Sequence, residues 1–116
     1  MKYMLLMYAS ESIVQGFNPE QFQQANQAWQ AFAKDVAAAG VLIGNNGLSP
    51  VATATTVRVR DGKPLTTDGP FAETHEQLAG YYLLNCKDLD EAIGWAARLP
   101  IAKYGSVEVR PLWGNS

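Results

Sequence analysis

Two stretches of the chain carry apolar or aromatic side chains at both odd and even positions. They are residues 2–8 and residues 78–84. A strand with one face in water alternates apolar and polar residues, so each stretch predicts a central strand that is buried on both faces. Strict alternation along the second strand places Leu78 on the same face as Tyr82 and Leu84.

Apolar residues at helical spacing predict two helices, each with a capping signal at its start. The first begins at Asn18-Pro19-Glu20-Gln21, which combines a cap, a first-turn proline and a capping box, and it ends at Gly40. Its apolar stripe consists of Phe22, Ala25, Trp29, Phe32, Ala33 and Val36. The second helix has a capping box at Asp88-Leu89-Asp90-Glu91 and stops at Pro100. Residues 10–17 are predicted to be a loop.

Three further sequence patterns predict the remaining strands of the fold. Residues 41–48 form a strand that a Gly-Asn-Asn-Gly run interrupts with a bulge or bend. Residues 55–67 form a hairpin around a two-residue turn at Asp61-Gly62. Residues 106–113 form the last strand, and Pro111 indicates a sheet edge or the strand's end.

The order strand-helix-strand, hairpin, strand-helix-strand predicts an α+β fold of the ferredoxin-like, split βαβ type. This fold is an antiparallel sheet with two helices on one face. The whole chain, 1–116, forms one domain with the hairpin inserted at about 51–67.

Two helices cover only one face of such a sheet, yet both central strands are apolar on both faces. A contiguous exposed apolar patch marks an interface or a ligand groove. We therefore predict a homodimer that packs sheet against sheet, with a cavity between helix, sheet and loop. The alternative is that the inserted hairpin folds back over the open face of its own subunit.

Composition narrows the class of function. The formal net charge is −2 and the basic residues are scattered, so no nucleic-acid partner is expected. No apolar run approaches the length of a membrane span, and residues 1–10, which superficially resemble a signal peptide, are predicted to be a strand. Cys86 is the only cysteine, which favours a reducing, cytoplasmic setting and a buried, inert thiol.

The run Asp68-Gly69-Pro70-Phe71 predicts a rigid bend, because Gly69 tolerates positive φ and Pro70 fixes φ and donates no N–H. The bend holds the Asp68 carboxylate and the Phe71 ring in a fixed relation. Asp68 has two interpretations, a general base or ligand-orienting group, and an Asx-type acceptor that stabilises the turn.

His75 is the only imidazole and lies close enough in sequence to contact Asp68 across a loop. A solvated loop histidine is the simpler interpretation. Glu73 and Glu76 flank His75, but a solvated acidic turn is favoured over a metal site, so neither a metal nor a cofactor is predicted.

Aromatic residues suggest a ligand pocket. Tyr8, Trp29, Phe71 and Tyr82 are candidates to line an apolar site for a small aromatic or hydrophobic molecule, although Trp29 also fits ordinary core packing. Arg58, on the same hairpin face as Arg60, either binds an anionic group or is solvated. Phosphate-loop, dinucleotide, paired-cysteine and nucleophile-elbow motifs are absent from the sequence.

Several segments together resemble the YCII-related domain family of the DGPF type, and the resemblance runs nearly end to end. They are Met1-Lys2-Tyr3-Met4-Leu5-Leu6, Ala52-Thr53-Ala54-Thr55-Thr56-Val57-Arg58, Asp68-Gly69-Pro70-Phe71-Ala72-Glu73-Thr74, Gly80-Tyr81-Tyr82, Asp88-Leu89-Asp90-Glu91-Ala92 and Gly105-Ser106-Val107-Glu108-Val109-Arg110-Pro111. The resemblance implies a bacterial protein that dimerises through its sheets into a dimeric α/β barrel.

The function that the resemblance implies is less specific. Enzymatic members carry a His on the first helix and an Asp just after the second, and one branch removes chloride from a chlorinated aromatic. The matching positions here are Trp29 and Leu99-Pro100, so that pair is absent. Members of the DGPF type are often encoded beside alternative sigma factors, which implies a regulatory role.

Two hypotheses follow. The first is a cofactor-free enzyme, of lyase or isomerase type, that uses Asp68 and His75 beside an apolar cavity into which Asp68 faces. The second is a non-catalytic binding or regulatory accessory module, linked to an alternative sigma factor.

Overall fold

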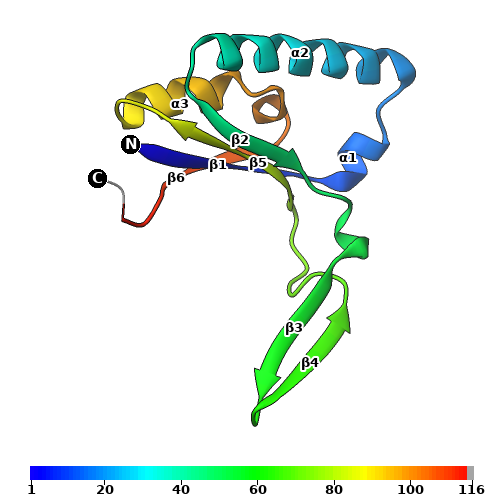
Figure 1. Cartoon of the computed structure of the whole chain (residues 1–116). Coiled ribbons are helices and arrows are strands. Elements are labelled where there is room, and N and C mark those ends of the chain that lie inside the picture. Colours follow the sequence, from blue (N-terminus) through cyan, green and yellow to red (C-terminus); the bar gives the residue numbers. More distant parts are fainter. Residues whose placement is uncertain (115–116) are drawn as a thin grey trace.

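The computed structural model describes residues 1–114, which form a four-stranded antiparallel sheet, two covering helices and a separate two-stranded hairpin. The elements, in chain order, are β1 (Lys2–Ala9), α1 (Glu11–Gln15), α2 (Pro19–Ala38), β2 (Leu42–Gly47), η1 (Val51–Thr53), β3 (Thr55–Arg60), β4 (Lys63–Asp68), β5 (Gln77–Asn85), α3 (Leu89–Arg98), η2 (Pro100–Lys103) and β6 (Ser106–Pro111). The strand order is β2-β5-β1-β6, and α2 and α3 lie on one face of the sheet (Figure 1). The predicted ferredoxin-like α+β fold is confirmed.

The core lies between the helices and one face of the sheet. Its buried residues alternate along the central strands and recur at helical spacing on α2 and α3, because only one side of each element meets the core. They include Tyr3, Leu5 and Met7 of β1, Tyr82 and Leu84 of β5, Phe32 and Val36 of α2, and Ala92 and Ala96 of α3. The ring of Phe32 meets Tyr82 edge-on, with centroids 5.1 Å apart.

The capping predictions are confirmed at the first helix and modified at the second. Asn18 Oδ1 accepts a hydrogen bond from the Gln21 N–H at 2.8 Å, and Gln21 Oε1 accepts one from the Asn18 N–H at 2.9 Å. At α3 the Asp88 carboxylate accepts from the Glu91 N–H. The Glu91 carboxylate instead accepts from the N–H of Lys87, one residue before the cap.

The predicted loop at residues 10–17 contains the short helix α1, so that prediction is wrong over Glu11–Gln15. A single helical turn is too short for apolar periodicity to reveal it. The turn is supported from elsewhere in the chain, because the Glu11 carboxylate accepts a hydrogen bond from the Val51 N–H at 3.0 Å.

A register shift in β5 corrects the predicted placement of Leu78. Met7 pairs with Gly80, but Tyr8 pairs with Leu78, so Ala79 is an extra, bulged residue. Directly opposed residues of an antiparallel pair share a face. Leu78 therefore lies beside Tyr8 on the open face, and not with Tyr82 and Leu84, whereas Ala79 packs against the core.

The edge strands agree with the sequence. A register shift between Leu42 and Gly44 gives β2 a bulge at Ile43, just before the Gly-Asn-Asn-Gly run in which it was predicted. Strand β6 is an edge strand that ends at Pro111. The hairpin turn is also confirmed, with φ of 52° at Asp61 and 73° at Gly62.

The second face of the sheet carries no helix in Figure 1. We call it the open face; its apolar residues are half-buried and consist of Met4, Leu6, Tyr8, Leu78, Tyr81 and Leu83. The β3–β4 hairpin, residues 55–68, projects away from the sheet and does not cover this face (Figure 1). The alternative in which the hairpin folds back over its own sheet is therefore wrong.

Candidate functional site

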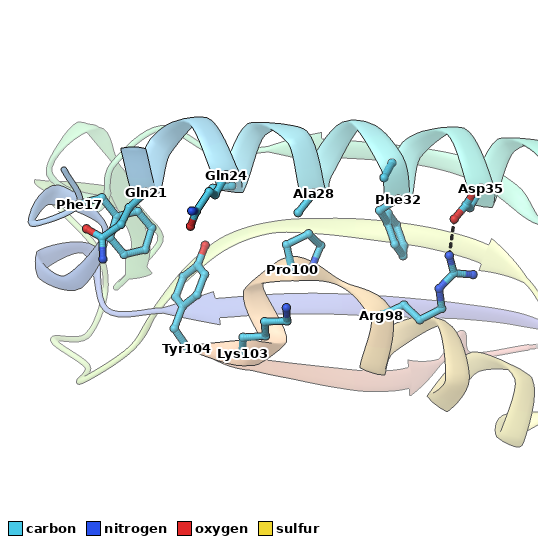
Figure 2. Close-up of a pocket in the computed structure, with 12 residues that line it drawn as sticks. Phe17, Gln21, Gln24, Ala28, Phe32, Asp35, Arg98, Pro100, Lys103 and Tyr104 are labelled. Carbon is cyan, nitrogen blue, oxygen red and sulfur yellow. Dashed lines mark hydrogen bonds and ion pairs between the residues drawn. The ribbon is translucent and has the colours of Figure 1, made fainter. Parts of the chain in front are cut away.

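A groove on the helix side of the sheet lies between α2 and the segment that runs from the end of α3 through η2. Its volume is about 450 Å³. Figure 2 shows α2 along one wall, with Arg98, Pro100, Lys103 and Tyr104 on the opposite wall.

Small side chains on α2 create this groove. Ala25, Ala28 and Ala31 line it, and the first large side chain that α2 buries in the core is Phe32. These methyl side chains are too short to fill the space between α2 and η2. The floor of the groove is therefore apolar, formed by these alanines with Phe32 and Pro100.

Polar groups lie at both ends of the groove, and Lys103 lies between them (Figure 2). At one end Arg98 forms an ion pair with Asp35, and the Arg98 guanidinium carbon lies 4.8 Å from the centroid of the Trp95 ring. Toward the other end lie Gln21 and Gln24 of α2. In Figure 2 the Tyr104 hydroxyl points toward Gln24.

Lys103 differs from Arg98 in having no partner. Its side chain is exposed, and it makes no ion pair or hydrogen bond with any residue of the described chain, 1–114. Burial raises the pKa of the neighbouring Tyr104 hydroxyl, so this phenol stays protonated and can donate a hydrogen bond. The groove thus offers the uncommitted cation of Lys103 beside the neutral hydroxyl donor of Tyr104.

The second hollow lies beneath Trp29 and has a volume of about 280 Å³. Its walls are mostly apolar, with Trp29, Ala79 and Ile101 among them, and Tyr104 lines both hollows. Glu11 supplies its carboxylate, one oxygen of which is held by the Val51 N–H.

The sheet separates the aromatic residues that the sequence grouped into one pocket. Trp29 and Tyr82 lie on the helix side, where their rings stack with centroids 6.4 Å apart and planes 8° apart. Tyr8 lies on the open face, where its hydroxyl donates to Glu108 Oε1 at 3.4 Å. Phe71 follows the hairpin and is 78% exposed. Only Trp29 of these four lines either hollow, so one subunit does not bring them together.

The predicted bend after β4 is present. Gly69 has a φ of 92°, and its N–H donates to Ala54 O at 2.7 Å across the base of the hairpin. The Asp68 side chain is exposed and has no hydrogen-bond or ion-pair partner within residues 1–114, so the Asx-type interpretation is not observed. Arg58 reaches the carbonyl oxygen of Phe71 at 3.5 Å.

His75 is exposed and, like Asp68, lacks a partner in the part of the chain that the structure describes. Asp68 and His75 line neither hollow. Over the same residues 1–114, no three His, Cys, Asp or Glu side chains gather as a metal site would require, and no helix is long and apolar enough to cross a membrane.

Cys86 is buried, and the pKa of its thiol is raised, first by burial and then by Glu91. Both effects favour the neutral thiol, which is the poorly nucleophilic form.

The groove residues Gln21, Gln24, Lys103 and Tyr104 were not predicted as a site. The Lys-Tyr pair follows the helix-stopping Pro100 by three residues, and this was the only local signal. The alanines of α2 gave no sequence signal for the groove, because small residues on a helix normally indicate close packing.

Comparison with known proteins agrees with this fold. The model of the YCII-related domain matches residues 1–114. An uncharacterized protein of Rhizobium meliloti (strain 1021) is 40% identical over 114 residues, which cover 97% of this chain and 92% of that protein. The chain belongs to the YCII-related domain family.

Proposed function

We propose that this protein binds a small organic acid with an apolar body in the groove between α2 and η2. The observation that carries the proposal is the unpaired ammonium of Lys103 beside an apolar floor. A ligand of this kind would place its hydrocarbon part over the alanines of α2 and its carboxylate at Lys103.

The size and chemistry of the groove support this class of ligand. Small-molecule sites typically have volumes of about 300–1,000 Å³ and combine mostly apolar walls with a few polar groups that orient the ligand. A carboxylate at Lys103 would form a charge-assisted hydrogen bond, and the Tyr104 hydroxyl, which lines the same groove, is a candidate for a second donor. Arg98 is less available, since Asp35 already neutralises its charge.

Binding without chemistry is the function that this groove supports best. The family resemblance places a catalytic His–Asp pair at positions that here are Trp29 and Leu99-Pro100, and Trp29 and Pro100 border the two hollows. Neither residue exchanges protons, so the non-catalytic alternative predicted from the sequence is preferred. A link to an alternative sigma factor rests on the resemblance alone.

The test is a titration with 4-phenylbutyrate, followed by tryptophan fluorescence and by amide chemical shifts. We expect Lys103→Gln to weaken binding about tenfold, which corresponds to about 1.4 kcal/mol. Lys34→Gln, on α2 but outside the groove, is the matched control and should bind like the wild type. Ala28→Leu should abolish binding by filling the groove. Equal affinities for wild type and Lys103→Gln would refute the proposal.

We further propose that the protein is a homodimer that buries the open face against the same face of a second copy. The half-buried apolar residues of this face support the proposal, since each side chain newly and fully buried contributes about 1.5–3 kcal/mol. The buried, unpaired Cys86 supports a reducing, cytoplasmic setting. Sedimentation at micromolar concentration tests the assembly, and a folded monomer would refute it.

Catalysis at Asp68 is a second candidate function. It is favoured by the unpaired Asp68 carboxylate beside Phe71, with Arg58 reaching that segment. In a sheet-to-sheet dimer, Tyr8 of the open face would lie on the side that meets the partner. The test compares wild type with Asp68→Asn for depletion of any compound in a metabolite extract; no difference would refute this candidate.

A further inference from the structure

We infer that the β3–β4 hairpin is an arm that holds the second copy of this chain. This inference rests on the proposed homodimer and adds a second contact region to it. We call residues 55–68 the arm.

The direction of the arm supports the inference. In Figure 1, α2 and α3 lie above the sheet, and the arm projects from the opposite side, which is the side of the open face. The radius of gyration is 16.3 Å, whereas a compact chain of this length has about 13 Å. The excess reflects a segment that extends beyond the body of its own subunit.

The length of the arm determines what it can reach. Each strand of the arm has 6 residues, which span about 20 Å at roughly 3.3 Å per residue. Two sheets that pack face to face lie about 10 Å apart. A second copy seated on the open face would therefore have the arm alongside it, and the arm would extend past the partner's sheet.

The two faces of the arm differ in chemistry. Cross-strand pairing places Val57 and Val59 on one face with Pro64, Thr66 and Asp68. The other face carries three cations, Arg58, Arg60 and Lys63, together with Leu65. Val57 and Val59 are 60% and 62% exposed. An isolated two-stranded hairpin is only marginally stable in water, so an apolar face of this kind needs a surface to pack on. We assign the valine face to the partner and the basic face to solvent.

The base of the arm is fixed to the body of the subunit. The Val51 N–H donates to the Glu11 carboxylate at 3.0 Å on one side of the arm, and the Gln77 amide donates to Thr74 O at 2.6 Å on the other. The Thr56 hydroxyl donates to Gly69 O at 2.8 Å across the base. The Glu11 bond ties the segment before the arm to α1, and the other two bonds order the base of the arm and the segment that follows it.

The test measures the dimer dissociation constant by sedimentation for three proteins. Val57→Thr with Val59→Thr removes apolar surface while keeping β-branched residues in the strand. Arg58→Thr with Arg60→Thr makes the same change on the opposite face and is the matched control. We expect the valine variant to raise the dissociation constant at least tenfold and the arginine variant to leave it within twofold. Circular dichroism and urea unfolding confirm that each variant is folded.

The outcomes separate the arm from the homodimer on which it rests. A monomeric wild type would overturn both. A dimeric wild type with an unchanged valine variant would overturn the arm contact and leave the sheet-to-sheet dimer standing. Weakening by the arginine variant alone would show that the basic face meets a partner, which also overturns the inference.

Discussion

The side-chain carbonyl of Gln77 accepts a hydrogen bond from the backbone N–H of Glu11 at 2.9 Å. Gln77 also donates to Thr74 O, and the Glu11 carboxylate accepts from the Val51 N–H. The side chains of Gln77 and Glu11 thus connect α1 to the start of β5. They also bind both ends of the segment that contains the arm. This connection explains why a single helical turn forms at Glu11–Gln15.

Replacement of Gln77 by alanine tests this connection. Gln77→Ala removes the partners of the Glu11 N–H and of Thr74 O, at a cost of about 1 kcal/mol for each hydrogen bond. We expect faster hydrogen exchange of the Glu11 amide and faster proteolysis within residues 69–76, with little change in the amides of the central strands. Gln23→Ala, on the exposed face of α2, is the control. Equal exchange in both variants would contradict the role of Gln77.

Removal of the Phe32 ring should strongly destabilise the fold. Phe32 is 3% exposed and packs edge-on against Trp29, Tyr82 and Trp95. We expect Phe32→Ala to lower the free energy of unfolding by about 3–5 kcal/mol, measured by urea denaturation. Phe22→Ala, on the same helix at a residue that is 45% exposed, should cost less than about 1 kcal/mol. Similar losses in both would mean that Phe32 is not a core residue.

The start of α2 should depend on its cap. Asn18→Ala removes the acceptor of the Gln21 N–H and should destabilise the protein by about 1 kcal/mol, measured as a lower urea midpoint. Asn26→Ala makes the same substitution within the exposed helix. It should be neutral or stabilising by about 0.5 kcal/mol, because alanine is the better helix former. Destabilisation by both would point to a loss unrelated to capping.

Stability should fall as the pH rises above about 9. The pKa of the Cys86 thiol is raised above its ordinary value of 9.0 by burial and by Glu91. Above that pH the unfolded chain loses the thiol proton while the folded chain keeps it, so the free energy of unfolding decreases with pH. Cys86→Ala should make this decrease above pH 9 shallower, whatever its effect at pH 7. An unchanged slope would contradict a raised pKa.

Local interactions explain the predictions that succeeded. Asn18 caps a helix because its short side chain reaches the N–H three residues on, and Asp61-Gly62 turns because both residues adopt positive φ. Pro111 ends an edge strand because it has no N–H to donate. Each of these depends on a few neighbouring residues, so the order of strands and helices followed from the chain alone.

The tertiary structure alone decided the position of the β5 bulge, the formation of the groove and the placement of the arm. Leu78 and Ala79 exchange faces through a bulge whose position depends on how β5 meets β1, and alternation within one strand cannot reveal it. The groove requires Ala25 and Ala28 of α2 to lie opposite Lys103 of η2. The segment that leads into the arm is tied to α1 by a hydrogen bond between residues 40 positions apart in sequence, Val51 and Glu11. Local chemistry therefore determined the elements, whereas contacts between distant segments determined the groove beside α2 and the direction of the arm.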